Sequence, residues 1–214
     1  SVNGEAVMLR RNFLIGSGLS LSALVMPGFG QAIAAEALLL PMDVSRKKSL
    51  VDIALNLATS SGASYCDVRI GRYLQQSIIT RESKVQSIVS SESIGAGIRV
   101  LVKGAWGFAA TSDLTATGIG NAVQQAMLIA NSNAKIQTQP VQLAKAPALG
   151  VVSWATPIKI NAMAIPVKEK ADLLLSVNAA AMNAGANFVN SQLFLVNEQK
   201  YFASTDGSYV DQDI

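Results

Sequence analysis

Few residues of this sequence are able to do chemistry. The chain has one cysteine, Cys66, and no histidine. A reactive thiolate needs a base or a cation beside it, and zinc sites and serine nucleophiles most often rely on imidazole. We therefore expect Cys66 to be a small buried hydrophobe that forms no internal disulfide. Within these residues we predict no catalytic, cofactor-binding or metal-binding side chain.

Two arginines occur in otherwise apolar stretches. Arg69 and Arg99 each follow a valine or isoleucine in a segment of strand-like composition. A structural interpretation pairs each with a carboxylate, such as Asp67 or Glu92, that offsets the cost of burying the charge. A functional interpretation has them hold the carboxylate of a bound peptide. The residue types favour the structural interpretation, and the functional one remains an alternative.

Two aromatic residues, Trp106 and Phe108, are candidates for the same site. Their spacing of two places both rings on one face of a strand, most simply toward the core. Gly104 and Gly107 flank Trp106, as if a large ring lay across a tight turn. We group Arg69, Arg99, Trp106 and Phe108 as candidate peptide-cleft or structural residues.

Gly95 and Gly97 form a G-x-G sequence that resembles part of a phosphate-binding loop. Such loops place the anion at the N-terminus of a following helix. Here a strand-like segment follows instead. Glycines inside strands more often allow a bulge or the close approach of another group, and this is our prediction for both.

The hydrophobic pattern predicts how these residues are positioned. Apolar residues recur every three or four positions in three segments, which predicts helices over residues 45–62, with Ser45 as N-cap, 112–130 and 166–185. Alternating segments predict a meander of four strands over 65–79, 84–90, 94–102 and 105–110. A second hairpin, 188–196 with 200–204, turns at Asn197-Glu198, and Asp206-Gly207 leads into a further strand. The fold class is α+β, an antiparallel sheet meander with about three helices packed on it.

The chain begins with features of an export signal. Arg10 and Arg11 precede an apolar run, and Ala32 and Ala34 form an A-x-A cleavage site. The string Arg10-Arg11-Asn12-Phe13-Leu14 resembles the twin-arginine consensus. We expect removal of residues 1–34, export to the periplasm or the extracellular space, and no membrane anchor afterwards, because glycines and serines interrupt the apolar run.

Composition limits the remaining organisation. Behind the signal we expect a linker (35–44), an α+β domain (45–135), an irregular connection (136–165), and a helix with strands that begin a following region (166–214). Half of the residues are apolar and the net charge is +3. No basic stripe with interleaved aromatic residues occurs, so we expect no nucleic-acid partner.

The segment 62–113 carries a family resemblance. It contains G-A-x-x-x-D-V-R from Gly62, G-x-G-I-R-V from Gly95 and G-A-W-G-F-A from Gly104. Together with the later F-A-S-T-D-G from Phe202, these strings resemble the N-terminal domain of the TldD/PmbA metallopeptidases, over about residues 45–214.

The resemblance implies a zinc peptidase whose metal is held by an H-E-x-x-x-H helix in the C-terminal half. Two histidines separated by little more than one helical turn reach one metal, and the glutamate activates water. No part of that motif is in this sequence, so we expect zinc only in a C-terminal half that lies outside it. The chain is then the non-catalytic N-terminal part of a protein about twice as long, which acts on unfolded peptides or modified peptide precursors.

The resemblance also implies a homo- or heterodimer with a TldD/PmbA-like subunit and an extended peptide as substrate. Two alternatives remain open. The chain is a metal-free scaffold subunit of such a protease, or it is a stand-alone periplasmic binding domain.

Overall fold

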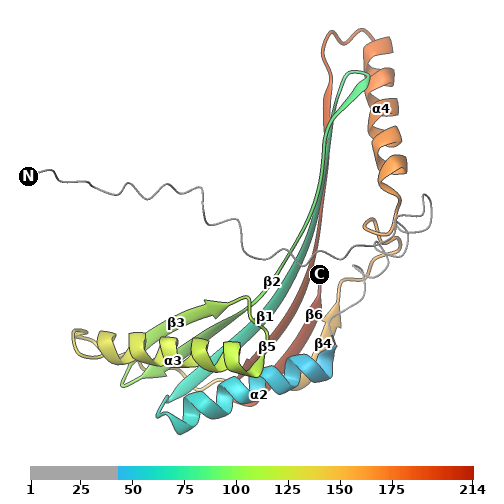
Figure 1. The fold of residues 1–214 in the computed structure, drawn as a ribbon. Helices are drawn as coiled ribbons and strands as arrows, with labels where there is room; N and C mark the ends of the chain where they lie inside the picture. Colours follow the sequence, from blue (N-terminus) through green and yellow to red (C-terminus); the bar gives the residue numbers. More distant parts are fainter. Residues whose placement is uncertain (1–42) are drawn as a thin grey trace, which may run out of the picture. The chain divides into compact units, whose positions relative to one another are not determined.

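A computed structural model describes residues 43–214. Six strands form one sheet in the order β3-β2-β1-β5-β6-β4, with three helices (Figure 1). The elements are α2 (Val44–Ser60), β1 (Tyr65–Arg81), β2 (Lys84–Val102), β3 (Ala105–Thr111), α3 (Ala116–Asn133), β4 (Gly150–Ala155), α4 (Val167–Asn183), β5 (Asn190–Ser204) and β6 (Ser208–Asp213). The predicted α+β class is confirmed. Arg10, Arg11, Ala32 and Ala34 of the export signal lie outside the described residues.

The first hairpin is longer and simpler than predicted. β2 is one strand of 19 residues, so the strands expected at 84–90 and 94–102 are continuous and the meander has three strands. The polar stretch Ser90 to Ser93 does not interrupt it, because β1 pairs with β2 along its whole length. Both faces of this part of β2 are exposed to solvent, and polar side chains are therefore tolerated there.

β5 also runs without a break. Asn197 and Glu198 lie inside the strand and pair with Leu74 and Tyr73 of β1, so the hairpin predicted there is wrong. β5 inserts between β1 and β6, whereas the turn at Asp206-Gly207 and the strand after it are confirmed. β4 lies within the connection expected to be irregular and pairs in parallel with β6.

Two helix starts differ from the prediction by a few residues. Asp43, not Ser45, caps α2, and its carboxylate accepts the Ser45 backbone N–H. Thr115 caps α3 by accepting the Gly118 N–H at 3.1 Å. Both caps use a short oxygen-bearing side chain that satisfies a free donor of the first turn.

The main core lies between the sheet and the pair α2 and α3. Even-numbered residues of β1, among them Val68 and Ile70, are buried against these helices, whereas Arg69 on the other face is exposed. A smaller cluster of Ile78, Ala171 and Leu174 joins α4 to the same face of the sheet, toward the Lys84 end of the hairpin. All three helices therefore cover one face.

α3 approaches the sheet closely at Gly107. A Cβ there would come within 2.0 Å of the Ala126 carbonyl oxygen, so only a glycine fits under the helix. Gly104 has φ +76° in the turn between β2 and β3. Among the described residues, no helix is both long and apolar enough to cross a membrane.

Candidate functional site

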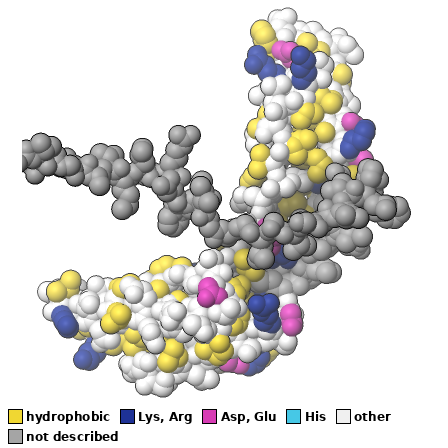
Figure 2. All heavy atoms as spheres, viewed as in Figure 1, with side chains coloured by type: hydrophobic (Ala, Val, Ile, Leu, Met, Phe, Trp, Pro, Cys, Tyr) yellow, Lys and Arg dark blue, Asp and Glu magenta, His cyan; other side chains and the backbone are white. Residues whose placement is uncertain are grey.

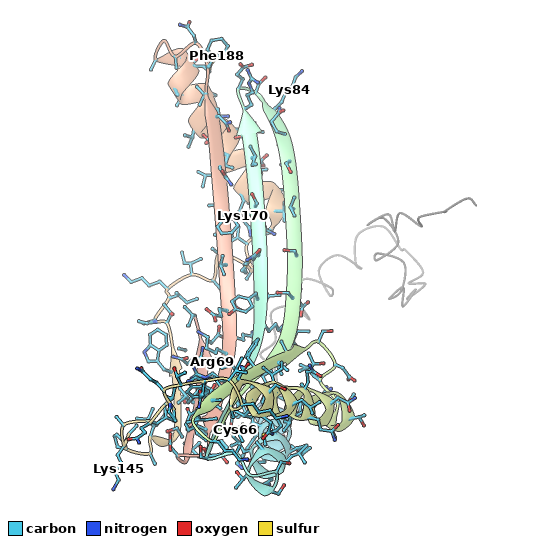
Figure 3. All side chains as sticks on the ribbon, turned by 90° about the vertical axis from the view of Figure 1, so that its left-hand side faces the viewer. Cys66, Arg69, Lys84, Lys145, Lys170 and Phe188 are labelled. Atoms are coloured by element: carbon cyan, nitrogen blue, oxygen red, sulfur yellow. The ribbon has the colours of Figure 1, made fainter. Side chains whose placement is uncertain are left out.

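The four candidate site residues share one face of the sheet. Arg69 belongs to the odd-numbered row of β1, and strand register places Arg99, Trp106 and Phe108 on the same side. We call this side, with Arg69, Tyr73, Arg99, Phe108 and Phe202, the open face, because the helices of residues 43–214 cover the other one. Figure 3 labels Arg69 between Cys66 and Lys170 along the sheet.

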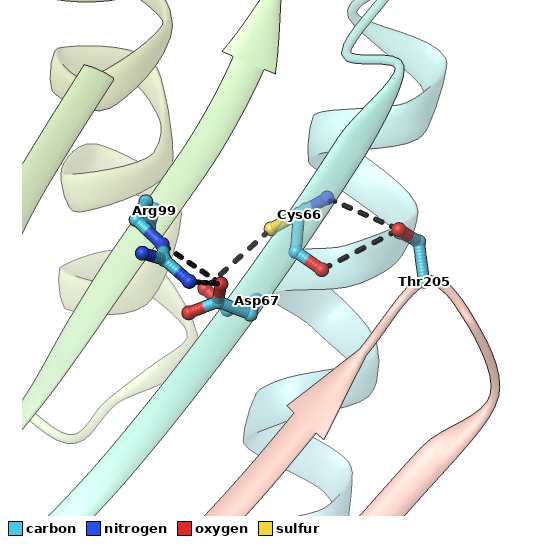
Figure 4. A network of polar contacts seen from close by, with 4 residues as sticks. All are labelled: Cys66, Asp67, Arg99 and Thr205. Carbon is cyan, nitrogen blue, oxygen red and sulfur yellow. Dashed lines mark hydrogen bonds and ion pairs between the residues drawn. The ribbon is translucent and has the colours of Figure 1, made fainter. Parts of the chain in front are cut away.

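Arg99 is held by a carboxylate and a ring. Its Nε and Nη2 groups donate to Asp67 Oδ2 at 2.9 and 2.6 Å (Figure 4). The guanidinium also lies 4.6 Å from the centroid of the Trp106 ring. Asp67 is 3% exposed, so the pair offsets the desolvation of the carboxylate. The predicted pairing with Asp67 is confirmed for Arg99.

Two groups beside this buried pair have raised pKa values. Burial, and then the charge of Asp67, raise the pKa of the Tyr65 hydroxyl to about 12. The Tyr65 ring meets Trp106 edge to face at 5.9 Å. Burial, followed by Asp67, also raises the pKa of the Cys66 thiol to about 12. Cys66 is fully buried, as predicted for a small hydrophobe.

Arg69 differs from Arg99. It is exposed, and its guanidinium lies 5.7 Å from the centroid of the Phe202 ring. Among residues 43–214, no carboxylate pairs with it and its side chain makes no hydrogen bond. Glu92, the other expected partner, binds Arg72 instead, with Oε1 2.6 Å from Nε.

The aromatic residues are not in the core. Phe108 is 58% exposed, and its ring covers Gly97, where a Cβ would lie 3.2 Å from the ring. Trp106 is half-buried between Tyr65 and Arg99. The core prediction is wrong because the helices pack on the opposite side of β3, against Gly107. The close approach predicted at Gly97 is confirmed.

A second group on the open face was not predicted. The Tyr73 ring lies over Gly71, and its hydroxyl donates to Glu198 Oε1 at 2.7 Å. Lys200 Nζ lies 2.8 Å from the same oxygen. Hydrogen bonding to Lys200 lowers the pKa of Glu198, and hydrogen bonding to Glu198 raises that of Tyr73. Alternation through residues 190–204 is the signal that would have placed Glu198 in a strand.

The helix-covered face holds buried charges that sequence patterns did not reveal. Lys47 of α2 pairs with Asp211 of β6, and its ammonium lies 5.3 Å from the centroid of the Tyr201 ring. Next to it, a cavity of about 420 Å³ opens at the starts of α2 and α3, with Arg46, Leu50 and Ile94 in its lining. The α2 residues, Ile94 and Asp211 are far apart in the sequence, so local patterns do not bring them together.

Lys170 of α4 is buried, and no carboxylate within residues 43–214 pairs with it. Its ammonium donates to Gln76 Oε1 at 2.5 Å and to the Ala162 carbonyl oxygen at 2.7 Å. Burial lowers its pKa. These bonds join α4 to the sheet and to the segment that precedes the helix.

The residues of 43–214 do not fit a zinc site. They contain no group of three histidine, cysteine, aspartate or glutamate side chains placed to hold a metal ion. Asp67 and Glu198, the acids of the open face, each form an ion pair with a basic side chain, Arg99 and Lys200 respectively. Among residues 43–214, the open face offers the unpaired Arg69 guanidinium and several aromatic rings as binding groups.

Comparison with known proteins agrees with this architecture. Residues 66–130, under a third of the chain, match the family model for PmbA/TldA metallopeptidase domain 1. No curated protein matches the sequence. Similar solved structures include a protein named as a candidate modulator of a DNA gyrase from Thermotoga maritima, at TM-score 0.63 and 16% identity over 78% of this chain. Others are TldE from Thermococcus kodakarensis (TM-score 0.61, 12% identity, 77% of this chain) and a candidate gyrase modulator from Bacteroides thetaiotaomicron (0.53, 17%, 78%).

The aligned part is a limited share of those structures. This chain covers 37%, 36% and 38% of them, respectively. At these identities the likeness establishes a common fold for this region.

Proposed function

We propose that this chain is the N-terminal, non-catalytic part of an exported PmbA/TldD-like zinc metallopeptidase that acts on extended or unfolded peptides. The match of residues 66–130 to the metallopeptidase family domain is the observation that carries this proposal. In this proposal the chain forms one side of the peptide-binding site. Hydrolysis and the metal belong to polypeptide outside these 214 residues, which hold no histidine.

The geometry of the sheet supports a role in holding peptides. β3 pairs only with Ala96 to Val102 of β2. Within the described residues, the outer edge of β2 from Lys84 to Gly95 therefore pairs with no strand. A free edge of this kind accepts an extended peptide as an added strand. The open face beside it offers aromatic rings and Arg69.

The experiment compares the 214-residue chain with the protein that its complete gene encodes. We expect the complete protein to cleave an unstructured peptide, and a chelator to abolish the cleavage. The chain alone binds the same peptide without cleaving it and carries no stoichiometric zinc. Chelator-sensitive cleavage by the chain alone would contradict the proposal. A complete protein that neither binds zinc nor cleaves peptides favours the scaffold subunit instead.

Export and assembly are part of the same proposal. The twin-arginine string supports export, and replacement of Arg10 and Arg11 by lysine is expected to retain the protein in the cytoplasm, as fractionation would detect. Normal export of that variant contradicts this route. For assembly, the proposed partner is a second PmbA/TldD-like subunit, identical or related, and sedimentation of the complete protein as a monomer contradicts it.

A further inference from the structure

The open face has an apolar surface interrupted by few charges. Its exposed apolar side chains come from three strands, β3, β4 and β5, and register places them on one side. They are Phe108, Trp154, Phe194, Val152 and Val196, between 42% and 58% exposed. Figure 2 shows that hydrophobic side chains also reach the surface elsewhere, among separate charged groups. Phe108 lies at the β3 edge of the sheet and Val152 and Trp154 at the β4 edge, so these apolar side chains flank the middle strands.

Among residues 43–214, the charged side chains of this face have an ionic partner except at one position, and Arg81 at the far end of β1 lies 3.9 Å from Glu82. Arg99 pairs with Asp67 and Lys200 pairs with Glu198, both at hydrogen-bonding distance. Each pair joins neighbouring strands or residues of the same face and leaves no net charge. Arg69, between them on β1, has no acidic partner among residues 43–214. The middle of the face therefore carries one unbalanced positive charge.

Aromatic rings border this charge on both sides. Phe202 is paired with Arg69 on β5 and lies 5.7 Å from the guanidinium. Gly97 is paired with it on β2, and the Phe108 ring covers Gly97. Rings exclude water from the sides of a guanidinium, and a charge-assisted hydrogen bond to a carboxylate is stronger where water is excluded.

A second copy of the chain is a poor occupant for this surface. In a two-fold dimer the same patch faces itself, so the two unpaired Arg69 side chains would approach each other without an acid. A segment with a carboxylate in the middle and apolar side chains on either side complements the surface in charge and in hydrophobicity.

We propose that the open face binds an extended peptide segment through a carboxylate that pairs with Arg69, while its apolar side chains contact the rings of Phe108 and Phe202. This rests on the proposed function and deepens it, because it assigns preference for acidic peptides to this face. Arg99, which is fixed by Asp67 and Trp106, positions the strand and does not contact the peptide carboxylate.

The test uses the 214-residue chain and two unstructured peptides of about 12 residues, a length that spans the strands. The peptides have alternating apolar residues and differ only in one central glutamate or glutamine. Both tryptophans of the chain, Trp106 and Trp154, lie on the open face by register, so tryptophan fluorescence reports binding. Arg69→Gln is compared with Arg81→Gln, a matched control at the exposed far end of the same row of β1.

The wild-type chain is expected to bind the glutamate peptide about tenfold more tightly than the glutamine peptide, a ratio that corresponds to about 1.4 kcal/mol. Arg69→Gln removes this difference, and Arg81→Gln preserves it. Equal binding of both peptides by the wild-type chain overturns the carboxylate preference and leaves the peptide-binding function standing. Absence of binding by either peptide overturns both. A dimer of the chain that excludes the glutamate peptide, seen in sedimentation with and without the peptide, also overturns the inference.

Discussion

Arg99 and Asp67 stand directly opposite each other in β2 and β1, and two guanidinium nitrogens of Arg99 donate to one oxygen of Asp67. The aspartate is buried while the arginine side chain is 43% exposed. The pair therefore binds the first hairpin together at the level of the main core, and solvent still reaches the cation.

Asp67→Asn is expected to destabilise the fold by about 1 to 3 kcal/mol, because it weakens a charge-assisted hydrogen bond to a buried group. Urea unfolding measures the change. Asp172→Asn is the control, since Asp172 forms an exposed pair with Lys168 on α4 and such pairs contribute under about 1 kcal/mol. Equal effects of the two variants would show that burial of Asp67 has no energetic consequence.

Gly107→Ala is expected to cost about 3 kcal/mol, at the upper end of overpacking effects. The added Cβ meets the Ala126 carbonyl oxygen at 2.0 Å and the Ala130 nitrogen at 2.7 Å, so α3 must move away from β3. Thermal unfolding measures this loss. Gly120→Ala is the control, because its nearest contact is 3.8 Å away. An unchanged midpoint for Gly107→Ala contradicts the described packing.

Asn178→Ala is expected to cost about 2 kcal/mol, because it leaves buried polar partners without hydrogen bonds. The Asn178 amide donates to Thr80 Oγ1 and the Glu82 carbonyl, and its oxygen accepts from Ser191 Oγ. Hydrogen exchange should show faster opening of α4 than of α3. The exposed Asn183→Ala on the same helix serves as control, and equal exchange in both variants argues against this anchor.

The stability of the chain is expected to fall at alkaline pH through Cys66. Folding raises the pKa of its thiol from 9.0 to about 12, so the folded state retains the proton more strongly than the unfolded state. The resulting stabilisation is complete below pH 9 and is lost as the pH rises toward 12. Unfolding midpoints of wild type and Cys66→Ala should therefore converge as the pH rises from 9 toward 12. A constant difference contradicts this, as does rapid alkylation of the native thiol.

Sequence patterns predicted the parts of this fold that depend on local interactions. The helices at α2, α3 and α4 were found because apolar residues at helical spacing must face one side. The hairpin turns predicted at residues 80–83 and 103–104 were found, the first one narrowed to 82–83, because a strand pattern stops on both sides of them. The caps Asp43 and Thr115 were missed by a few residues, because several neighbouring side chains are capable of capping.

The rest depended on partners distant in the sequence. Glu198 and Ser91 are polar. Polarity was interpreted as a turn at Glu198 and as a break between two strands at Ser91, although pairing with β1 keeps both β5 and β2 extended. The side to which Phe108 points was predicted wrongly, because alternation gives two faces without stating which one the helices cover. The pair of Arg99 with Asp67 was predictable since both lie in adjacent strands. The absence of an acidic partner for Arg69 within residues 43–214 was not predictable.

The insertion of β5 between β1 and β6 has a consequence for how the chain acquires its structure. Asp67 must find Ser204 as its neighbour, so the sheet closes only after nearly the whole segment from Asp67 to Ser204 has left the ribosome. Pairings this remote in sequence slow folding. Until then, one long edge of β1 remains unpaired and is available to chaperones and to other nascent chains.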